Sequence, residues 1–204
     1  TVGQVTNTLF AVLHFAGMYT LDSLVEIDEN ALERMVRVNF LGACLVNRAL
    51  MPYLSEGSRI VMTTSELAPL DPLPFTGLYA VTKSALDKYA FSLRMELQLL
   101  GISVSVLRAG AVKTDMLGAS VKALDDFCLK TKLYKCNAER FRHIVDSVEA
   151  KCVPPEKIAE KMLKIAETKH PRFAYAVNRN PYLRLLHLLP RGLQCRIIRR
   201  VLRP

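Results

Sequence analysis

The chain has 204 residues, of which 50% are hydrophobic and 23% are charged. These values are ordinary for one soluble α/β domain, and no apolar run reaches the roughly 18 residues that a membrane-spanning helix needs. The cysteines lack paired metal-ligand spacing, so we expect reduced thiols in a cytoplasmic protein and no metal site.

The net charge of +9 is concentrated at one end of the chain. Residues 179–204 contain seven arginines and no acidic residue, so this segment carries +7 and the remainder carries +2. No aromatic residues alternate with the arginines, as a nucleic-acid platform would require. We therefore expect no nucleic-acid partner, and membrane headgroups or an acidic protein fit better.

The first predicted elements lie in residues 1–20. Residues 1–8 read as the end of a helix, and the apolar run 10–14 reads as a buried strand. His14 ends this strand, where a structural role is expected in preference to proton transfer. Ala16 and Gly17 follow, and small residues of this kind let the backbone approach a ligand closely.

A long helix is predicted over 28–54, with Asp28 as its N-cap and apolar residues spaced to face a core. Asn39 lies inside this helix, where an asparagine is locally unfavourable and needs a reason. Either its amide is satisfied by neighbouring polar groups, or it serves the function of the protein.

The next stretch pairs a buried strand at 60–64 with a helix at 77–100, joined by a proline-rich loop. Tyr79 and Lys83 are four residues apart on this helix, so they share one face. An adjacent ammonium favours the phenolate, which predicts a Tyr79 pKa below the usual value of about 10. Ser65, at the carboxyl end of the strand, can bring a hydroxyl to the same place.

The helix at 77–100 carries more apolar residues than one buried face needs. One face is expected to cover the sheet, and the other, with the helix that bears Asn39, to meet a second subunit. A buried strand at 102–108 comes next, followed by the segment RAGAVKTDM at 108–116.

These landmarks together resemble the short-chain dehydrogenase/reductase family. The resemblance rests on the YxxxK pair Tyr79 and Lys83, on Ser65 fourteen residues earlier, on Asn39 in VNFLG, and on RAGAVKTDM, in which Ala109 replaces the usual proline. It implies a Rossmann-like, doubly wound parallel α/β sheet, and the helix-sized crossovers predict neighbouring parallel strands at 10–14, 60–64, 103–107 and 172–177.

The resemblance also implies an activity, the interconversion of an alcohol and a carbonyl by hydride transfer with NAD or NADP. Tyr79 would be the general acid or base, Ser65 would orient the substrate oxygen, and Lys83 would lower the Tyr79 pKa and bind the nicotinamide ribose. Asn39 would distort its helix and hold a relay water. The cofactor would also contact Ala16, Gly17, Ala109, Gly110, Val112 and Thr114.

The glycine-rich phosphate turn and the acidic ribose-binding residue of that family are not found in these 204 residues. We therefore expect the carboxyl-terminal portion of a Rossmann domain, a truncated member of the family that by itself is poorly soluble and binds no dinucleotide. The choice between NAD and NADP stays open. The alternatives are a non-catalytic protein of this fold and a module that binds a membrane surface or another protein.

The remaining chain is predicted to form two short helices within 115–152, a helix beginning at Pro154 and Pro155, and a strand at 172–177. In the resembled family the first of these regions is a mobile substrate lid. Its apolar residues are candidates for a pocket or for the core, namely Phe127, Leu133, Tyr134, Phe141 and Ile144.

We interpret residues 1–178 as the partial Rossmann domain and 179–204 as an amphipathic, basic pair of short helices. Such a tail either packs over the lid or a subunit interface, or attaches to a membrane surface through 181–204.

Overall fold

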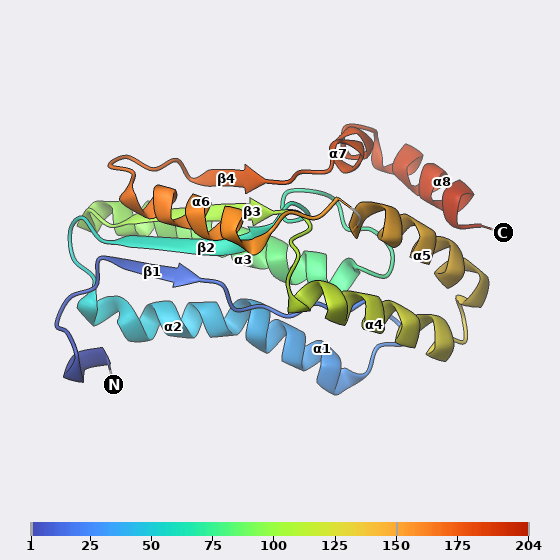
Figure 1. Ribbon diagram of the computed structural model, residues 1–204, viewed down its shortest axis with the longest axis horizontal. Coiled ribbons are helices and arrows are strands. Elements are labelled where there is room, and N and C mark those ends of the chain that lie inside the picture. The colour runs from blue at the N-terminus through green and yellow to red at the C-terminus, as the bar shows by residue number, and fades with distance from the viewer. Residues whose placement is uncertain (1, 150, 204) are drawn as a thin grey trace.

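The structure is a computed structural model that describes residues 2–149 and 151–203, with the backbone alone for 115–121 and 146–149. Within these residues, four strands form a sheet that has helices on both faces (Figure 1). The strands are β1 (Ala11–His14), β2 (Arg59–Ser65), β3 (Ser103–Ala109) and β4 (Ala174–Val177). The α-helices are α1 (Glu29–Val36), α2 (Gly42–Leu50), α3 (Gly77–Leu97), α4 (Asp115–Lys130), α5 (Lys135–Glu149), α6 (Pro155–Glu167), α7 (Pro181–His187) and α8 (Arg191–Leu202).

The sheet has the strand order β1-β2-β3-β4, and every neighbouring pair is parallel. This confirms the predicted order and direction. The central strands are buried on both faces, as their unbroken apolar and β-branched sequences predict. β4 begins at Ala174 and is therefore two residues shorter than the predicted strand 172–177. Before the strand, the backbone N–H of Arg172 donates a hydrogen bond to the Tyr175 hydroxyl at 2.9 Å.

Two core clusters lie on opposite faces of the sheet. On one face α2 and α3 pack against Ile60, Met62, Val104 and Val106. On the other face α6 packs through Ile158, Met162 and Ile165 against Val61 and Leu107 (Figure 1). The doubly wound arrangement is therefore present around β2 and β3.

A third cluster lies beyond the carboxyl ends of the strands, where α4, α5, α7 and α8 gather (Figure 1). Phe75 is at its centre, in ring contact with Phe127 and Phe141, and Leu202 of α8 joins it. The prediction of two short helices in this region is wrong in length, since α4 has 16 residues and α5 has 15. The Glu26 carboxylate holds the break at 131–134, because it accepts hydrogen bonds from the Thr131 hydroxyl and from the backbone N–H of Lys132 and Leu133.

The predicted helix over 28–54 is helical throughout but is not uniform. Asp28 caps it by accepting a hydrogen bond from the backbone N–H of Ala31, as predicted. Residues Arg37–Leu41 form a π-helical turn between α1 and α2, and Met51–Tyr53 form a 3₁₀ turn at the end. A further 3₁₀ turn, Val2–Gln4, stands where the end of a helix is predicted in residues 1–8. The helix predicted over 77–100 also ends differently, because its last three residues, Gln98–Leu100, form a 3₁₀ turn.

Candidate active site

Ser65 and Tyr79 meet at the carboxyl edge of the sheet. Ser65 is the last residue of β2, and Tyr79 lies in the first turn of α3, so the loop 66–76 folds back to bring them together. The Ser65 hydroxyl lies close enough to the Tyr79 phenol to influence the pKa of the phenol. Ser65 Oγ also accepts a hydrogen bond from the backbone N–H of Leu67 at 3.2 Å. The predicted contact between the serine hydroxyl and the phenol is therefore present.

The predicted effect of Lys83 on Tyr79 is not seen. Burial raises the pKa of the Tyr79 phenol to about 12, the hydrogen bond from Ser65 lowers it in part, and the nearby charge of Glu66 raises it further. Lys83 Nζ lies 5.8 Å from the centre of the Tyr79 ring and donates to the backbone oxygen of Thr63 instead. Tyr79 is thus protonated at neutral pH, in the form that can give a proton away.

Lys83 is buried behind Tyr79, one turn further along α3. Burial lowers the pKa of its ammonium to about 8, so the group is still mostly charged at pH 7. Its three N–H donors have one hydrogen bond described, to Thr63 O at 3.3 Å. A buried cation with donors to spare suits the vicinal hydroxyls of a ribose, so the donor set fits a nicotinamide cofactor at this point.

Asn39 sits in the middle of the π-helical turn and is buried. Its side-chain oxygen accepts from Met18 N–H at 2.8 Å, and its Nδ2 donates to Met18 O at 2.9 Å and to the Thr82 hydroxyl at 3.1 Å. The helix is distorted here, as the resemblance implies. The amide ties the turn after β1, which contains Ala16 and Gly17, to α3 between Tyr79 and Lys83.

His14 has the structural role that its position predicts. Its Nε2 lies 2.7 Å from the side-chain oxygen of Asn47, and Asn47 Nδ2 donates to the Tyr89 hydroxyl at 3.3 Å. Burial lowers the pKa of His14. This chain of contacts ties β1 to α2 and α3.

The segment at 108–116 turns sharply after β3, and the turn depends on Gly110. A side chain at Gly110 would place its Cβ 1.8 Å from the backbone oxygen of Asn178, so only glycine fits. Asn178, itself at a positive φ of 55°, donates from Nδ2 to the backbone oxygens of Ala111 and Lys151. Beyond it the Val112 oxygen accepts from Thr114 N–H at 2.9 Å, and the Thr114 side chain is exposed at the same edge of the sheet.

Two acidic residues near the site were missed by reasoning from the sequence. Glu66 follows Ser65 directly, is buried, and accepts a hydrogen bond from Asn180 N–H at 2.6 Å. Burial raises the pKa of this carboxyl group. Asp87, one turn after Lys83, forms a buried ion pair with Arg108 on β3 at 2.7 Å and accepts from the Thr64 hydroxyl. A carboxylate on a long helix gives no sequence signal of an arginine partner on the strand that follows.

Glu66→Gln should lower the pH at which the Tyr79 phenol loses its proton. The Glu66 charge disfavours phenolate, so its removal should lower the Tyr79 pKa, while the glutamine oxygen can still accept from Asn180 N–H. For any reaction step that needs the deprotonated phenol, the rising limb of the pH–rate profile should move to lower pH. Glu96→Gln, an exposed change further along α3, serves as the control. Identical profiles for both variants and the unmodified protein would rule out Glu66 as an influence on Tyr79.

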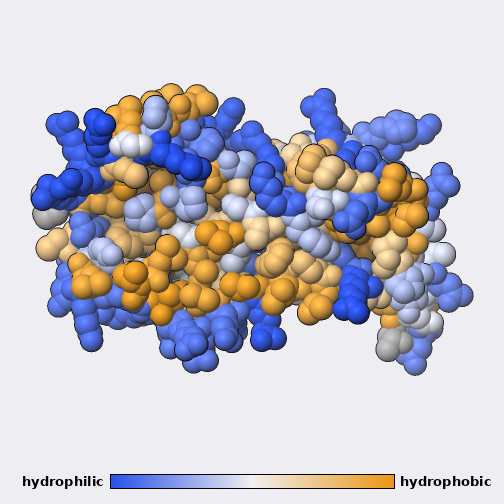
Figure 2. All heavy atoms as spheres, turned by 180° about the vertical axis from the view of Figure 1, so that it is seen from behind, coloured by the Kyte–Doolittle hydropathy of each residue, from blue (hydrophilic) through white to orange (hydrophobic). Residues whose placement is uncertain are grey.

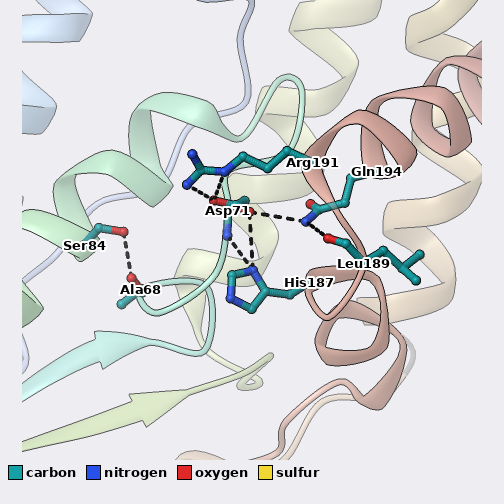
Figure 3. Close-up of polar contacts among 7 residues, drawn as sticks. All are labelled: Ala68, Asp71, Ser84, His187, Leu189, Arg191 and Gln194. Carbon is teal, nitrogen blue, oxygen red and sulfur yellow. Dashed lines mark hydrogen bonds and ion pairs between the residues drawn. The ribbon is translucent and has the colours of Figure 1, made fainter.

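The loop 66–76 is held from the other side by the C-terminal helices (Figure 3). Asp71 lies between three residues of the tail. Arg191 donates to its Oδ1 at 2.9 Å, Gln194 donates to its Oδ2 at 3.3 Å, and His187 Nδ1 is 3.6 Å from Oδ2. The Ser84 hydroxyl of α3 donates to Ala68 O at 2.8 Å (Figure 3). The loop between Ser65 and Tyr79 is thus fixed to α3 on one side and to α7 and α8 on the other.

The candidate pocket residues within 115–152 lie in different environments. Phe127 and Phe141 are core, packed on Phe75, and Leu133 is exposed. Tyr134 lines an open cavity of about 520 Å³ between residues 23–25, Phe75, α5 and α8. In the part of the chain that the structure describes, no cluster of His, Cys, Asp or Glu could hold a metal ion.

A family model described as short chain dehydrogenase matches residues 1–125. The chain belongs to the short chain dehydrogenase family. A dehydrogenase from Rhodococcus sp. that is named for 1-hydroxy-2-glutathionyl-2-methyl-3-butene is 31% identical over 110 residues, which are 53% of this chain and 49% of that protein. An uncharacterized oxidoreductase of Escherichia coli, YbbO, is 36% identical over 111 residues, covering 53% of this chain and 40% of that one.

Solved structures of short chain dehydrogenases share the fold. One from Burkholderia cenocepacia, in complex with NADP, superposes with a TM-score of 0.66 at 21% identity, over 86% of this chain and 66% of that one. A dehydrogenase/reductase from Sinorhizobium meliloti gives a TM-score of 0.63 at 24% identity, over 83% and 62%. Against the curated family members that it matches, the chain spans about half of their length or less.

Proposed function

We propose that this protein, in its active form, is an NAD(P)-dependent oxidoreductase that interconverts an alcohol and a carbonyl. Tyr79 gives a proton to the substrate oxygen in reduction or takes it in oxidation, and Ser65 orients that oxygen. Lys83 and the edge formed by Ala16, Gly17, Gly110, Val112 and Thr114 hold the cofactor. A bound nicotinamide supplies or accepts the hydride, and the cofactor class, NAD or NADP, is left open by these residues.

One observation carries the proposal, namely that Ser65 and Tyr79 meet at the carboxyl edge of the sheet with Lys83 buried one turn behind. The phenol is protonated at neutral pH, because burial raises its pKa to about 12. Family membership supports an oxidoreductase, and the NADP bound by one structural relative supports a nicotinamide cofactor.

Lys83→Met should weaken cofactor binding and slow turnover together. The methionine fills a similar volume but removes the buried donors that the proposal assigns to the ribose. Fluorescence titration with NADH and NADPH, followed by steady-state rates, measures the two effects separately. Lys88→Met, an exposed change one turn away, should leave both unchanged.

If Lys83→Met binds the cofactor as tightly as the unmodified protein, the role of Lys83 in cofactor binding is wrong. If the unmodified protein neither binds a nicotinamide dinucleotide nor turns over, the non-catalytic alternative is favoured.

We also propose that the face formed by α1, α2 and α3 packs against a second copy of the chain. Hydrophobic side chains run across this face (Figure 2). These side chains are roughly half exposed, and they include Leu41, Leu45, Val46, Val81, Phe91 and Met95. Two long helices with uncovered apolar residues are typical of a subunit interface.

A further inference from the structure

The C-terminal helices α7 and α8 each use one face to pack against the domain. On α7, Leu183, Leu186 and His187 face Leu67, Leu70 and Leu73 of the loop 66–76. On α8, Gln194 and Leu202 are buried. Both helices are therefore docked, and the ion pair between Arg191 and Asp71 fixes the orientation of α8 (Figure 3).

Docking leaves a second apolar face on each helix uncovered. On α7, Tyr182, Leu185 and Leu188 recur every third residue and are 72%, 62% and 79% exposed. On α8, Leu193 and Val201 lie two turns apart on the same side and are 40% and 45% exposed. The packed and uncovered faces together explain why the tail has more leucines and isoleucines than one buried face needs.

The same two helices and their flanks carry exposed arginines. Arg184, Arg196, Arg199, Arg200 and Arg203 are exposed, and residues 179–204 contain no acidic residue to neutralise them. Arg191, a further arginine of the tail, forms an ion pair with Asp71. Figure 2 shows hydrophobic side chains beside strongly hydrophilic ones at this end of the molecule, at the upper left. No helix among the described residues is long and apolar enough to cross a bilayer.

We propose that this outer face of the tail, made by Tyr182, Leu185, Leu188, Leu193 and Val201 with the arginines around them, binds the surface of an anionic phospholipid bilayer. The exposed leucines and tyrosine would enter the boundary between headgroups and acyl chains, while the guanidinium groups stay at the level of the lipid phosphates. Charge complementarity decides the partner, because the surface offers cations around an apolar centre and a bilayer offers the reverse.

The open cavity lies against the same helix. Ile198, Arg199, Leu202 and Arg203 line one wall of it, and the exposed side chains of Leu24 and Val25 line another. α8 thus contributes both to the proposed bilayer-binding face and to the wall of this cavity.

Vesicle flotation tests the proposal with the full 204-residue chain. We expect the protein to float with vesicles of phosphatidylcholine that contain about 30% phosphatidylserine, and not with phosphatidylcholine alone, because the arginines require anionic lipid. Leu185→Ser with Leu188→Ser should reduce the bound fraction at least about tenfold, since each leucine loses its burial in the bilayer. Arg196→Gln with Arg200→Gln should also reduce the bound fraction and make the remaining binding less sensitive to salt.

Leu99→Ser is the matched control, because Leu99 is 82% exposed at the end of α3, far along the chain from the tail. It should float like the unmodified chain. The proposal is overturned if the unmodified chain fails to float, if it floats equally without anionic lipid, or if the paired leucine variant floats unchanged. It is also overturned if the paired leucine variant instead converts a dimer to a monomer in sedimentation, since a second copy would then cover this face.

Discussion

Tyr79→Phe should lower turnover of an active form of the protein by about 10²- to 10⁴-fold, the usual contribution of a positioned general acid or base. The substitution removes only the hydroxyl that faces Ser65 and leaves the ring in place against Tyr19, whose ring centre is 4.7 Å away. Folding and cofactor affinity should change little. This separates Tyr79 from Lys83, whose replacement should affect affinity as well.

Tyr89→Phe on the same helix is the control for the loss of a tyrosine hydroxyl. Its oxygen accepts a hydrogen bond from Asn47 on the side of α3 that faces α2, so activity should stay close to that of the unmodified protein. Steady-state rates with saturating cofactor measure both variants. A Tyr79→Phe protein that keeps more than about a hundredth of the activity would contradict the proton-transfer role.

Asp87→Asn should destabilise the protein by about 3–5 kcal/mol, a large part of the stability of an ordinary domain. The change leaves the Arg108 guanidinium with no carboxylate in a place where both side chains are largely buried. Urea unfolding, followed by circular dichroism, measures the difference. Replacing both residues, with Asp87→Leu and Arg108→Met, should restore much of the stability, because a buried pair exchanged for apolar groups is often nearly neutral.

Asp125→Asn provides the matched comparison on the surface. Asp125 pairs with Arg142 between α4 and α5, and both side chains are 40% or more exposed. Solvent screens this pair, so its loss should cost about 0–1 kcal/mol. Equal costs for the two substitutions would mean that burial of the Asp87–Arg108 pair contributes nothing.

The sheet and the pairing of Ser65 with Tyr79 could be predicted from the sequence because they follow from local patterns. Apolar runs locate β2 and β3, helix-sized crossovers make their neighbours parallel, and a serine at a strand end meets a tyrosine in the first turn of the next helix. The distortion at Asn39 was expected from the resemblance to the family, and the asparagine alone left its role open.

The electrostatics of the site could not be predicted in the same way. The sequence places Lys83 on the same face as Tyr79, but it does not show that the ammonium turns to Thr63 O or that burial dominates the phenol. The hydrogen bond between Glu66 and Asn180 joins residues that are more than a hundred positions apart in the chain. The contacts of Asp71 with the tail span a similar separation. Only the assembled fold brings such groups together.

The sheet has a consequence for how the chain folds. Ala11 pairs with Arg59, Arg59 with Ser103, and Val106 with Ala174, so among the described strands every pairing closes over a whole helix and its connections. Each such closure costs chain entropy before any contact between strands compensates for it. Proteins whose contacts join residues far apart in the sequence therefore fold slowly. Helices such as α3 can form locally within about a microsecond, whereas the parallel sheet must wait for these distant segments to meet. Refolding should therefore be limited by sheet assembly, and the apolar strands stay exposed to intermolecular association until it is complete.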